Sequence, residues 1–277
     1  MTARIKGTDW SHWNGKPDCV KAKELGIEWA YTKAGEINPT TENEYWDTSY
    51  ERNLQKLKEN DIIAGAYYYV HPSVGASVQA RHFERIMEVS GKPDFLVLDL
   101  EDSDGLQPQD VASVVKAILE RLEKDLGKRP LIYTSNSFWT SKVGAPDWGK
   151  DYYFIIAQYP YVDSATKQEL PVYDMDAFNY KMSPVNAKIA DRVVAWQFSS
   201  YVKLAGMPRM DGNFWLKERE LLHEIAGKTT WPVSTPTENQ PHVTEEMQEM
   251  YGEARERWNK THTEENSFWW KILRSWK

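Results

Sequence analysis

Two patterns of apolar residues alternate along this chain. Short apolar runs rich in β-branched and aromatic residues predict strands, and longer segments with apolar residues every three or four positions predict helices. The alternation of the two is typical of an α/β fold in which helices cover a parallel sheet or barrel. We expect strands at residues 4–9, 28–33, 62–70, 95–100, 130–134, 153–158 and 193–198, with an eighth over 210–215.

The clearest helical pattern follows the fourth predicted strand. It begins near Pro108 and ends at Gly127. Its apolar residues recur at i, i+3 and i+4 spacing, so they form one stripe that we expect to pack against the strands. The stripe comprises Val111, Val114, Val115, Ile118, Leu119 and Leu122.

A change in composition near residue 228 predicts a domain boundary. Residues 228–242 contain three Pro and several Ser, Thr and Asn without periodicity, which is typical of a linker. We therefore expect a main domain over residues 1–227 and a helical C-terminal extension over residues 243–277. The chain length of 277 residues suits one large barrel of roughly 200 to 250 residues with such an appendage.

Composition further limits the classes of function that fit this chain. The net charge of −7 argues against nucleic acid as a partner, because phosphate binding needs clustered Lys and Arg. Cys19 is the single cysteine, so the chain forms no intrachain disulfide. The 13 Trp and 15 Tyr exceed what a core of this size needs. Carbohydrate stacking is one use for this surplus, and ordinary packing is the other.

The fourth predicted strand ends in two acids. In FLVLDLED, side chains alternate, so Asp99 and Glu101 point to the same side with Cα atoms roughly 6 to 7 Å apart. Two carboxyls this close raise each other's pKa and retain a shared proton, which general acid catalysis on a glycosidic oxygen requires. Asp9, Glu36 and Asp211 also lie in or after predicted strands, where a barrel places its active site. Any one of these three could instead be a loop acid in a turn or cap.

Other catalytic chemistries lack a matching pattern. His12, His71 and His82 fall in separate segments without metal-ligand spacing, so we expect no metal site and no cofactor. No glycine-rich phosphate loop follows a strand, and no serine stands in a nucleophile elbow.

Successive motifs between residues 4 and 216 resemble those of the glycoside hydrolase family 25 lysozymes, in the family's order. They are GTDWSHWNG, AYTKAGE, IIAGAYYYVHP, FLVLDLED, GKRPLIYTSNSFW, IIAQY and AWQFSS followed by MDGNFW. The resemblance implies an irregular, TIM-barrel-like (β/α) barrel with fewer helices than strands. It also implies a muramidase that cuts the β-1,4 bond between N-acetylmuramic acid and N-acetylglucosamine in bacterial peptidoglycan.

The resemblance assigns roles to the acids. Glu101 matches the family's proton donor, and Asp99 matches the partner carboxylate that orients the acetamido group or stabilises the developing cation. Asp9 and Asp211 match the two remaining acids of the cleft. The nucleophile is then either an enzyme carboxylate or the substrate's own acetamide.

The expected substrate contacts lie around these acids. They are Lys33, Glu36, Tyr67, Tyr69, Tyr133, Trp139, Tyr159, Trp196 and Gln197. The chain departs from the family at three places: KAGEI replaces Lys-Ala-Thr-Glu-Gly, three tyrosines at 67–69 replace Tyr-His-Phe, and Gln158 stands where His is common.

Two alternatives remain open. The first is a cell-wall-binding or virion structural module that keeps the barrel but has lost turnover. The second is a chitinase-like barrel glycosidase, whose full Asp-x-x-Asp-x-Asp-x-Glu pattern is absent here.

The C-terminal extension and the N-terminus bear on location. Trp269, Leu273 and Trp276 line one face of a predicted helix that also carries three cationic residues. Such a face suits a membrane, an anionic wall polymer, the barrel itself or a second subunit. The first residues lack the apolar stretch of a signal peptide. We therefore expect a phage endolysin that leaves the host cytoplasm through a holin to reach the cell wall, or one carried in a virion.

Overall fold

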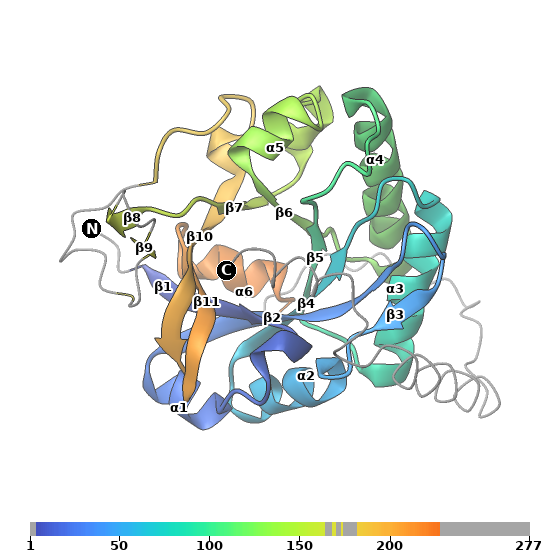
Figure 1. The fold of residues 1–277 in the computed structure, drawn as a ribbon. Helices are drawn as coiled ribbons and strands as arrows, with labels where there is room; N and C mark the ends of the chain where they lie inside the picture. Colours follow the sequence, from blue (N-terminus) through green and yellow to red (C-terminus); the bar gives the residue numbers. More distant parts are fainter. Residues whose placement is uncertain (1–3, 164–167, 170–172, 174–181, 228–277) are drawn as a thin grey trace. The chain divides into compact units, whose positions relative to one another are not determined.

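Eight strands close into a barrel within residues 4–163, 168–169, 173 and 182–227, the part of the chain that the computed structural model describes (Figure 1). Around the barrel the strands run in the order β1, β2, β4, β5, β6, β7, β10, β11 and back to β1. They are β1 (Ile5–Trp10), β2 (Ile27–Ile37), β4 (Ile63–Tyr69), β5 (Phe95–Asp99), β6 (Leu131–Ser135), β7 (Phe154–Ala157), β10 (Val193–Leu204) and β11 (Met207–Trp215). All eight predicted strands are confirmed.

One strand breaks the parallel order of the barrel. β11 runs antiparallel to both of its neighbours, β10 and β1, whereas the other neighbouring strands pair parallel. β10 and β11 are joined at Ala205 and Gly206, whose φ angles of 53° and 77° fit the two-residue turns that suit the twist of a hairpin. Two shorter pairings lie outside the barrel, where β3 (Glu44–Trp46) pairs with the end of β2 and β8 (Tyr161–Asp163) pairs with β9 (Gln168–Glu169).

Six α-helices accompany the eight barrel strands in the described residues. This confirms the irregular barrel, with fewer helices than strands, that the family resemblance implied. The α-helices are α1 (Cys19–Glu24), α2 (Tyr50–Glu59), α3 (Ala76–Ser90), α4 (Pro108–Leu126), α5 (Asn136–Ser141) and α6 (Arg219–Ile225). α4 begins and ends as predicted, with Pro108 in its first turn and Gly127 in the left-handed conformation at its end. Among the described helices, none combines the length and apolarity that crossing a membrane requires.

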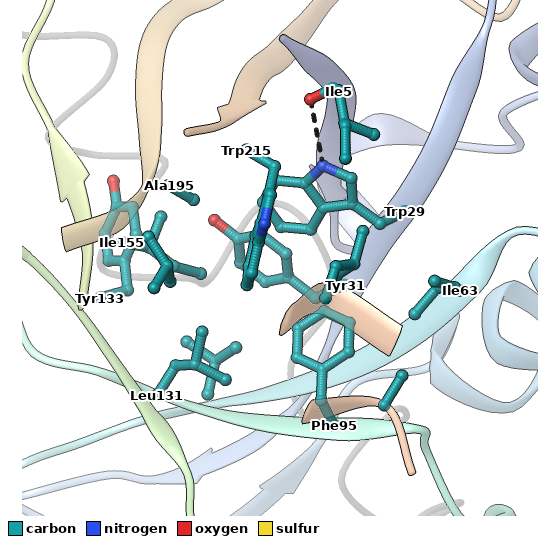
Figure 2. Close-up of a cluster of buried hydrophobic side chains, with 14 residues drawn as sticks. Ile5, Trp29, Tyr31, Ile63, Phe95, Leu131, Tyr133, Ile155, Ala195 and Trp215 are labelled. Atoms are coloured by element: carbon teal, nitrogen blue, oxygen red, sulfur yellow. Dashed lines mark hydrogen bonds between the residues drawn. The ribbon is translucent and has the colours of Figure 1, made fainter. Parts of the chain in front are cut away.

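The barrel interior holds a cluster of buried aromatic and aliphatic side chains (Figure 2). Trp29 packs against Tyr31, Phe95 and Trp215, and its Nε1 donates a hydrogen bond to the Ile5 carbonyl oxygen at 3.4 Å. Leu222 and Ala226, from α6 and the residue that follows it, join the same cluster. The described core therefore extends as far as Ala226.

Two glycines make room for these large rings. A Cβ at Gly7 would lie 2.2 Å from Trp29, and a Cβ at Gly65 would lie 2.4 Å from Phe95. Both distances are far below van der Waals contact, so the aromatic cluster depends on the missing side chains.

The interior changes from apolar to polar along each strand. Since every second side chain points inward, Trp29 and Tyr31 are followed by Lys33, while Phe95 and Val97 are followed by Asp99. The same alternation places the functional side chains at the carboxyl ends of the parallel strands. The predicted linker, residues 228–242, and extension, residues 243–277, lie outside the described residues.

Candidate active site

A pocket lined by acids and tyrosines borders the apolar cluster. Its lining comprises Asp9, Tyr31, Tyr67, Asp99, Glu101, Tyr133, Tyr159, Gln197 and Asp211. β1, β5 and β11 each supply an acid, and Glu101 follows two residues after the end of β5. The structure thus brings the four acids that the sequence singled out as catalytic into one pocket.

Asp9 and Asp211 lie directly opposite each other in the antiparallel β1–β11 ladder. Like charges in this position repel each other across a few ångströms. The pKa values of both carboxyls are raised, mainly by burial, and for Asp211 next by the charge of Asp9. Asp9 is supported as an anion because its Oδ2 accepts hydrogen bonds from Asn213 Nδ2 at 2.7 Å and Gln197 Nε2 at 2.8 Å.

Gln197 connects this acid to the tyrosines of the pocket. Its Oε1 accepts hydrogen bonds from the hydroxyls of Tyr133 at 2.6 Å and Tyr159 at 2.5 Å, while its Nε2 donates to Asp9. These three bonds fix the orientation of the amide. If its oxygen and nitrogen changed places, the oxygen would face the Asp9 carboxylate, which has no hydrogen to donate. Gln197 therefore orders three pocket side chains at once.

Asp99 and Glu101 form the second acid pair. Burial raises the pKa of Asp99 well above its ordinary value, followed by the charge of Glu101, whereas Lys33 acts to lower it. The pKa of Glu101 is also raised, chiefly because the surrounding protein displaces water from its carboxyl and next because of Asp9. Part of Glu101 remains open to solvent, while Asp99 is buried and its Oδ1 has no hydrogen-bond partner among the described residues. Such a pair favours one shared proton.

Lys33 and Glu36 lie beside the pocket and bind each other. Lys33 Nζ is 3.0 Å from Glu36 Oε2 and lies over the rings of Tyr69 and Tyr45, at 5.2 and 5.7 Å from their centroids. Burial alone would lower the pKa of Lys33, but the neighbouring carboxylates, Glu36 first, raise it overall. The ammonium group is therefore a fixed positive charge beside the acids.

Two expected sugar-binding rings lie in the core instead. Trp139 is 0% exposed and packs edge-on against Trp148 and Phe154, and Trp196 is 1% exposed with its Nε1 donating to the Gln158 carbonyl oxygen. A ring without accessible surface cannot stack on a sugar, so this prediction is wrong for both residues.

Sequence reasoning missed two side chains of the site. Tyr31 lines the pocket, and Asn213 holds Asp9. Each lies two residues from a predicted site residue on the same strand, Lys33 and Asp211, so the alternation of strand side chains could have identified both.

The histidines that could suggest a metal each have a separate partner. His12 Nδ1 lies 2.7 Å from Asp47, His71 Nδ1 lies 3.0 Å from Asp104, and His82 Nδ1 lies 2.9 Å from the Tyr68 hydroxyl. Within the described ranges, no group of three or more His, Cys, Asp or Glu side chains is arranged to hold a metal ion.

Comparison with known proteins identifies a family and a fold. Residues 8–207 match the glycosyl hydrolases family 25. The uncharacterized protein YegX of Escherichia coli strain K12 is 33% identical over 159 residues, which cover 54% of this chain and 57% of YegX. Lysozyme M1 of Streptomyces globisporus is 25% identical over 154 residues, which cover 52% of this chain and 51% of that protein. The chain thus matches little more than half the length of these relatives.

The fold is shared with solved structures. The bacterial lysozyme from Streptomyces coelicolor superimposes with a TM-score of 0.66 at 21% identity, covering 83% of this chain and 100% of that one. The similarity confirms the barrel.

Proposed function

Because this chain belongs to the glycosyl hydrolases of family 25, we propose that it is a muramidase acting on bacterial peptidoglycan. It hydrolyses the β-1,4 bond between N-acetylmuramic acid and N-acetylglucosamine. The observation that carries this proposal is the convergence of Asp9, Asp99, Glu101 and Asp211 in one tyrosine-lined pocket. Lysozyme M1, a relative, bears the corresponding activity in its name.

Glu101 serves as the general acid in this proposal. Its raised pKa keeps a proton on the carboxyl into the range where an ordinary Glu would be ionised, and its solvent-open position lets it reach the glycosidic oxygen of a bound glycan. Proton donation to that oxygen allows the leaving sugar to depart as a neutral alcohol.

Asp99 acts as the partner carboxylate. Its buried Oδ1, without a partner in the described part of the chain, can accept a hydrogen bond from the substrate's acetamido group or face the positive charge that develops on the sugar ring. Asp9, whose Oδ2 accepts hydrogen bonds from Asn213 and Gln197, adds negative charge to the pocket, which supports the same oxocarbenium-like transition state.

Replacement of Glu101 tests the proposal. Glu101→Gln removes the transferable proton and should lower the rate of cell-wall lysis by roughly 10² to 10⁴-fold while the protein folds normally. Turbidity of purified cell walls measures the rate, and Glu24→Gln, on an exposed position of α1, is the matched control. Near wild-type lysis by Glu101→Gln would falsify the assignment.

Mass analysis of the soluble products identifies the bond. Fragments should carry N-acetylmuramic acid at the new reducing end, whereas reducing-end N-acetylglucosamine would indicate a glucosaminidase. A protein that sediments with walls but releases no fragments would instead support the wall-binding alternative.

A further inference from the structure

One face of β11 leads from the core of the barrel to the rim of the pocket. Side chains alternate along a strand, so Asn213, Asp211 and Arg209 point to the same side, with successive Cα atoms roughly 6 to 7 Å apart. Asn213 is 0% exposed and donates to Asp9. Asp211 lines the pocket, and Arg209 is exposed. Arg209 therefore lies on the pocket side of the strand, one step beyond the last acid.

The part of β11 that carries Arg209 projects beyond β1. The β1–β11 ladder ends at the Asp9–Asp211 pair. Past that pair, β11 continues in a ladder with β10 as far as the Leu204–Met207 pair beside the turn. Arg209 thus belongs to a hairpin at the rim of the pocket, and not to the closed wall of the barrel (Figure 1).

Two contacts with β10 hold the Arg209 side chain. Its Nε donates a hydrogen bond to the Ser200 carbonyl oxygen at 3.2 Å, and its guanidinium carbon lies 5.6 Å from the centroid of the Tyr201 ring. A side chain that is already held loses less conformational entropy when it binds a ligand. Because the hydrogen bond uses Nε, the terminal nitrogens Nη1 and Nη2 remain as paired donors.

No acid within the described ranges forms an ion pair with Arg209. Glu169 of β9, which shares Ser200 with it, accepts hydrogen bonds from the backbone N–H and the hydroxyl of Ser200 instead. Lys33 offers a contrast, because its ammonium group lies 3.0 Å from Glu36 Oε2. Arg209 is therefore a cation at the rim of an acidic pocket whose terminal nitrogens have no acceptor in the described part of the chain.

The chemistry of a guanidinium group indicates what it binds. Its planar, paired N–H groups match the two oxygens of a carboxylate, and the pair of hydrogen bonds is stronger and more directional than one from an ammonium group. Four carboxyls in the pocket repel an anionic substrate, and a cation at the rim offsets that repulsion.

Peptidoglycan carries such carboxylates on one of its two sugars. N-acetylmuramic acid differs from N-acetylglucosamine by a lactyl ether. The lactyl carboxyl is either free or joined to a peptide stem that has carboxylates of its own. A neutral glycan of N-acetylglucosamine alone offers no such group.

We propose that Arg209 is a specificity-determining residue that binds a carboxylate borne by the lactyl group of N-acetylmuramic acid or by its peptide stem. Arg209 is not part of the pocket lining, so it binds this substituent and not the glycosidic bond. The inference rests on the proposed function, because it concerns a part of the proposed substrate.

Binding of a disaccharide without a cleavable bond tests the site. N-acetylglucosaminyl-N-acetylmuramic acid lacks the bond between N-acetylmuramic acid and N-acetylglucosamine, so isothermal titration calorimetry measures affinity without turnover. Three forms are compared: the free lactyl acid, its neutral methylamide, and the form whose lactyl group carries L-alanyl-D-glutamate. Arg209→Gln should weaken binding of at least one charged form roughly 3- to 10-fold and leave the affinity for the methylamide unchanged.

The two charged forms distinguish the sources of the carboxylate. Dependence on Arg209 for the free acid alone assigns the site to the lactyl group, because this carboxyl is an amide in the peptide form. Dependence for the peptide form assigns it to the stem. Arg209→Lys should restore only part of the affinity, since an ammonium group lacks the paired donors. Arg81→Gln, exposed on α3, is the matched control and should change none of the affinities.

Kinetics on soluble peptidoglycan fragments read the consequence for the reaction. Arg209→Gln should raise KM with kcat unchanged, because the carboxylate is bound equally in the ground state and the transition state. Equal effects of Arg209→Gln on all three ligands, or no effect on any of them, would overturn the proposal. A wild-type protein that binds a charged form through Arg209 but cuts no glycan would refute the proposed function alone.

Discussion

Asp9 and Asp211 face each other across the β1–β11 ladder, and Asp99 and Glu101 share the opposite side of the same pocket. All four carboxyls have raised pKa values, with burial as the first cause in each case. The native state therefore binds protons that the unfolded chain releases. Function places these charges where stability alone would not.

Stability should consequently fall as pH rises. A carboxyl whose pKa is raised by folding stabilises the native state while it is protonated, and this contribution is lost as pH rises through the raised pKa. Asp211→Asn removes the charge and should raise Tm at pH 7, by about 2 to 4 °C for each kcal/mol gained in the free energy of unfolding. The gain in Tm should be much smaller at pH 4.

Thermal unfolding at the two pH values measures this difference. Asp191→Asn, an exposed substitution, should change Tm at neither pH. An equal effect of Asp211→Asn at pH 4 and pH 7 would show that packing, and not ionisation, is responsible.

The residues that meet in the pocket were predictable where polarity and strand position agreed. Asp9 and Asp99 lie at the carboxyl ends of apolar strands, Glu101 follows two residues after β5, and Asp211 interrupts the middle of β11. Aromatic residues gave no such signal. The amphipathic character of a Trp suits both a core and a sugar site, so the burial of Trp139 depends on packing partners that the local sequence does not reveal.

At the scale of elements, β2 shows what local pattern omits. The apolar pattern predicted a strand over residues 28–33, but β2 extends from Ile27 to Ile37 because its last part pairs with β3, Glu44–Trp46. That extension rests on pairing with Glu44–Trp46, 7 to 11 residues later in the chain, which the local sequence of residues 34–37 does not reveal. β10 likewise continues past its predicted end at residue 198 to Leu204, and β11 begins at Met207 rather than at residue 210, because these two parts pair with each other. The other barrel strands are largely buried, so their apolar runs were sufficient.

Gly35 makes the extended strand possible. A Cβ there would lie 2.2 Å from the Tyr45 carbonyl oxygen and 2.8 Å from Ile86 Cδ1. Gly35→Ala should therefore lower the free energy of unfolding by roughly 1 to 3 kcal/mol, because backbone oxygen cannot move aside as a side chain can.

Urea denaturation measures the loss. The matched control is Gly75→Ala, where the nearest atom to the new Cβ, Val78 Cγ2, is 3.8 Å away and no clash arises. Equal stability of the two variants would mean that β2 and β3 separate without cost.

At the scale of the whole molecule, the aromatic cluster of the described residues includes Leu222 of α6 and the following Ala226, so the barrel and its core are assembled from residues before 228 in this structure. A chain truncated after Gly227 should therefore fold and still hydrolyse soluble glycan fragments. Gel filtration, circular dichroism and release of muropeptides would establish this. An insoluble or unfolded product would require the domain boundary at residue 227 to be withdrawn.

The reaction should also proceed without a metal ion. Carboxyl groups alone supply the proposed proton transfer and charge stabilisation, so EDTA should leave the rate of wall lysis unchanged. Loss of lysis in the chelator, restored by one added divalent metal, would contradict the mechanism.

The reversed strand β11 also bears on when the pocket can form during synthesis. The hydrogen bond from Asn213 to Asp9 joins positions 204 residues apart, and β11 supplies the ladders to both β1 and β10 that close the ring. Contacts so distant in sequence form late in folding, because the loop between them must close first. A nascent chain still lacking residues 207–215 has no Asp211 and no closed barrel. The proposed muramidase should therefore gain its activity only after residues 207–215 have been synthesised.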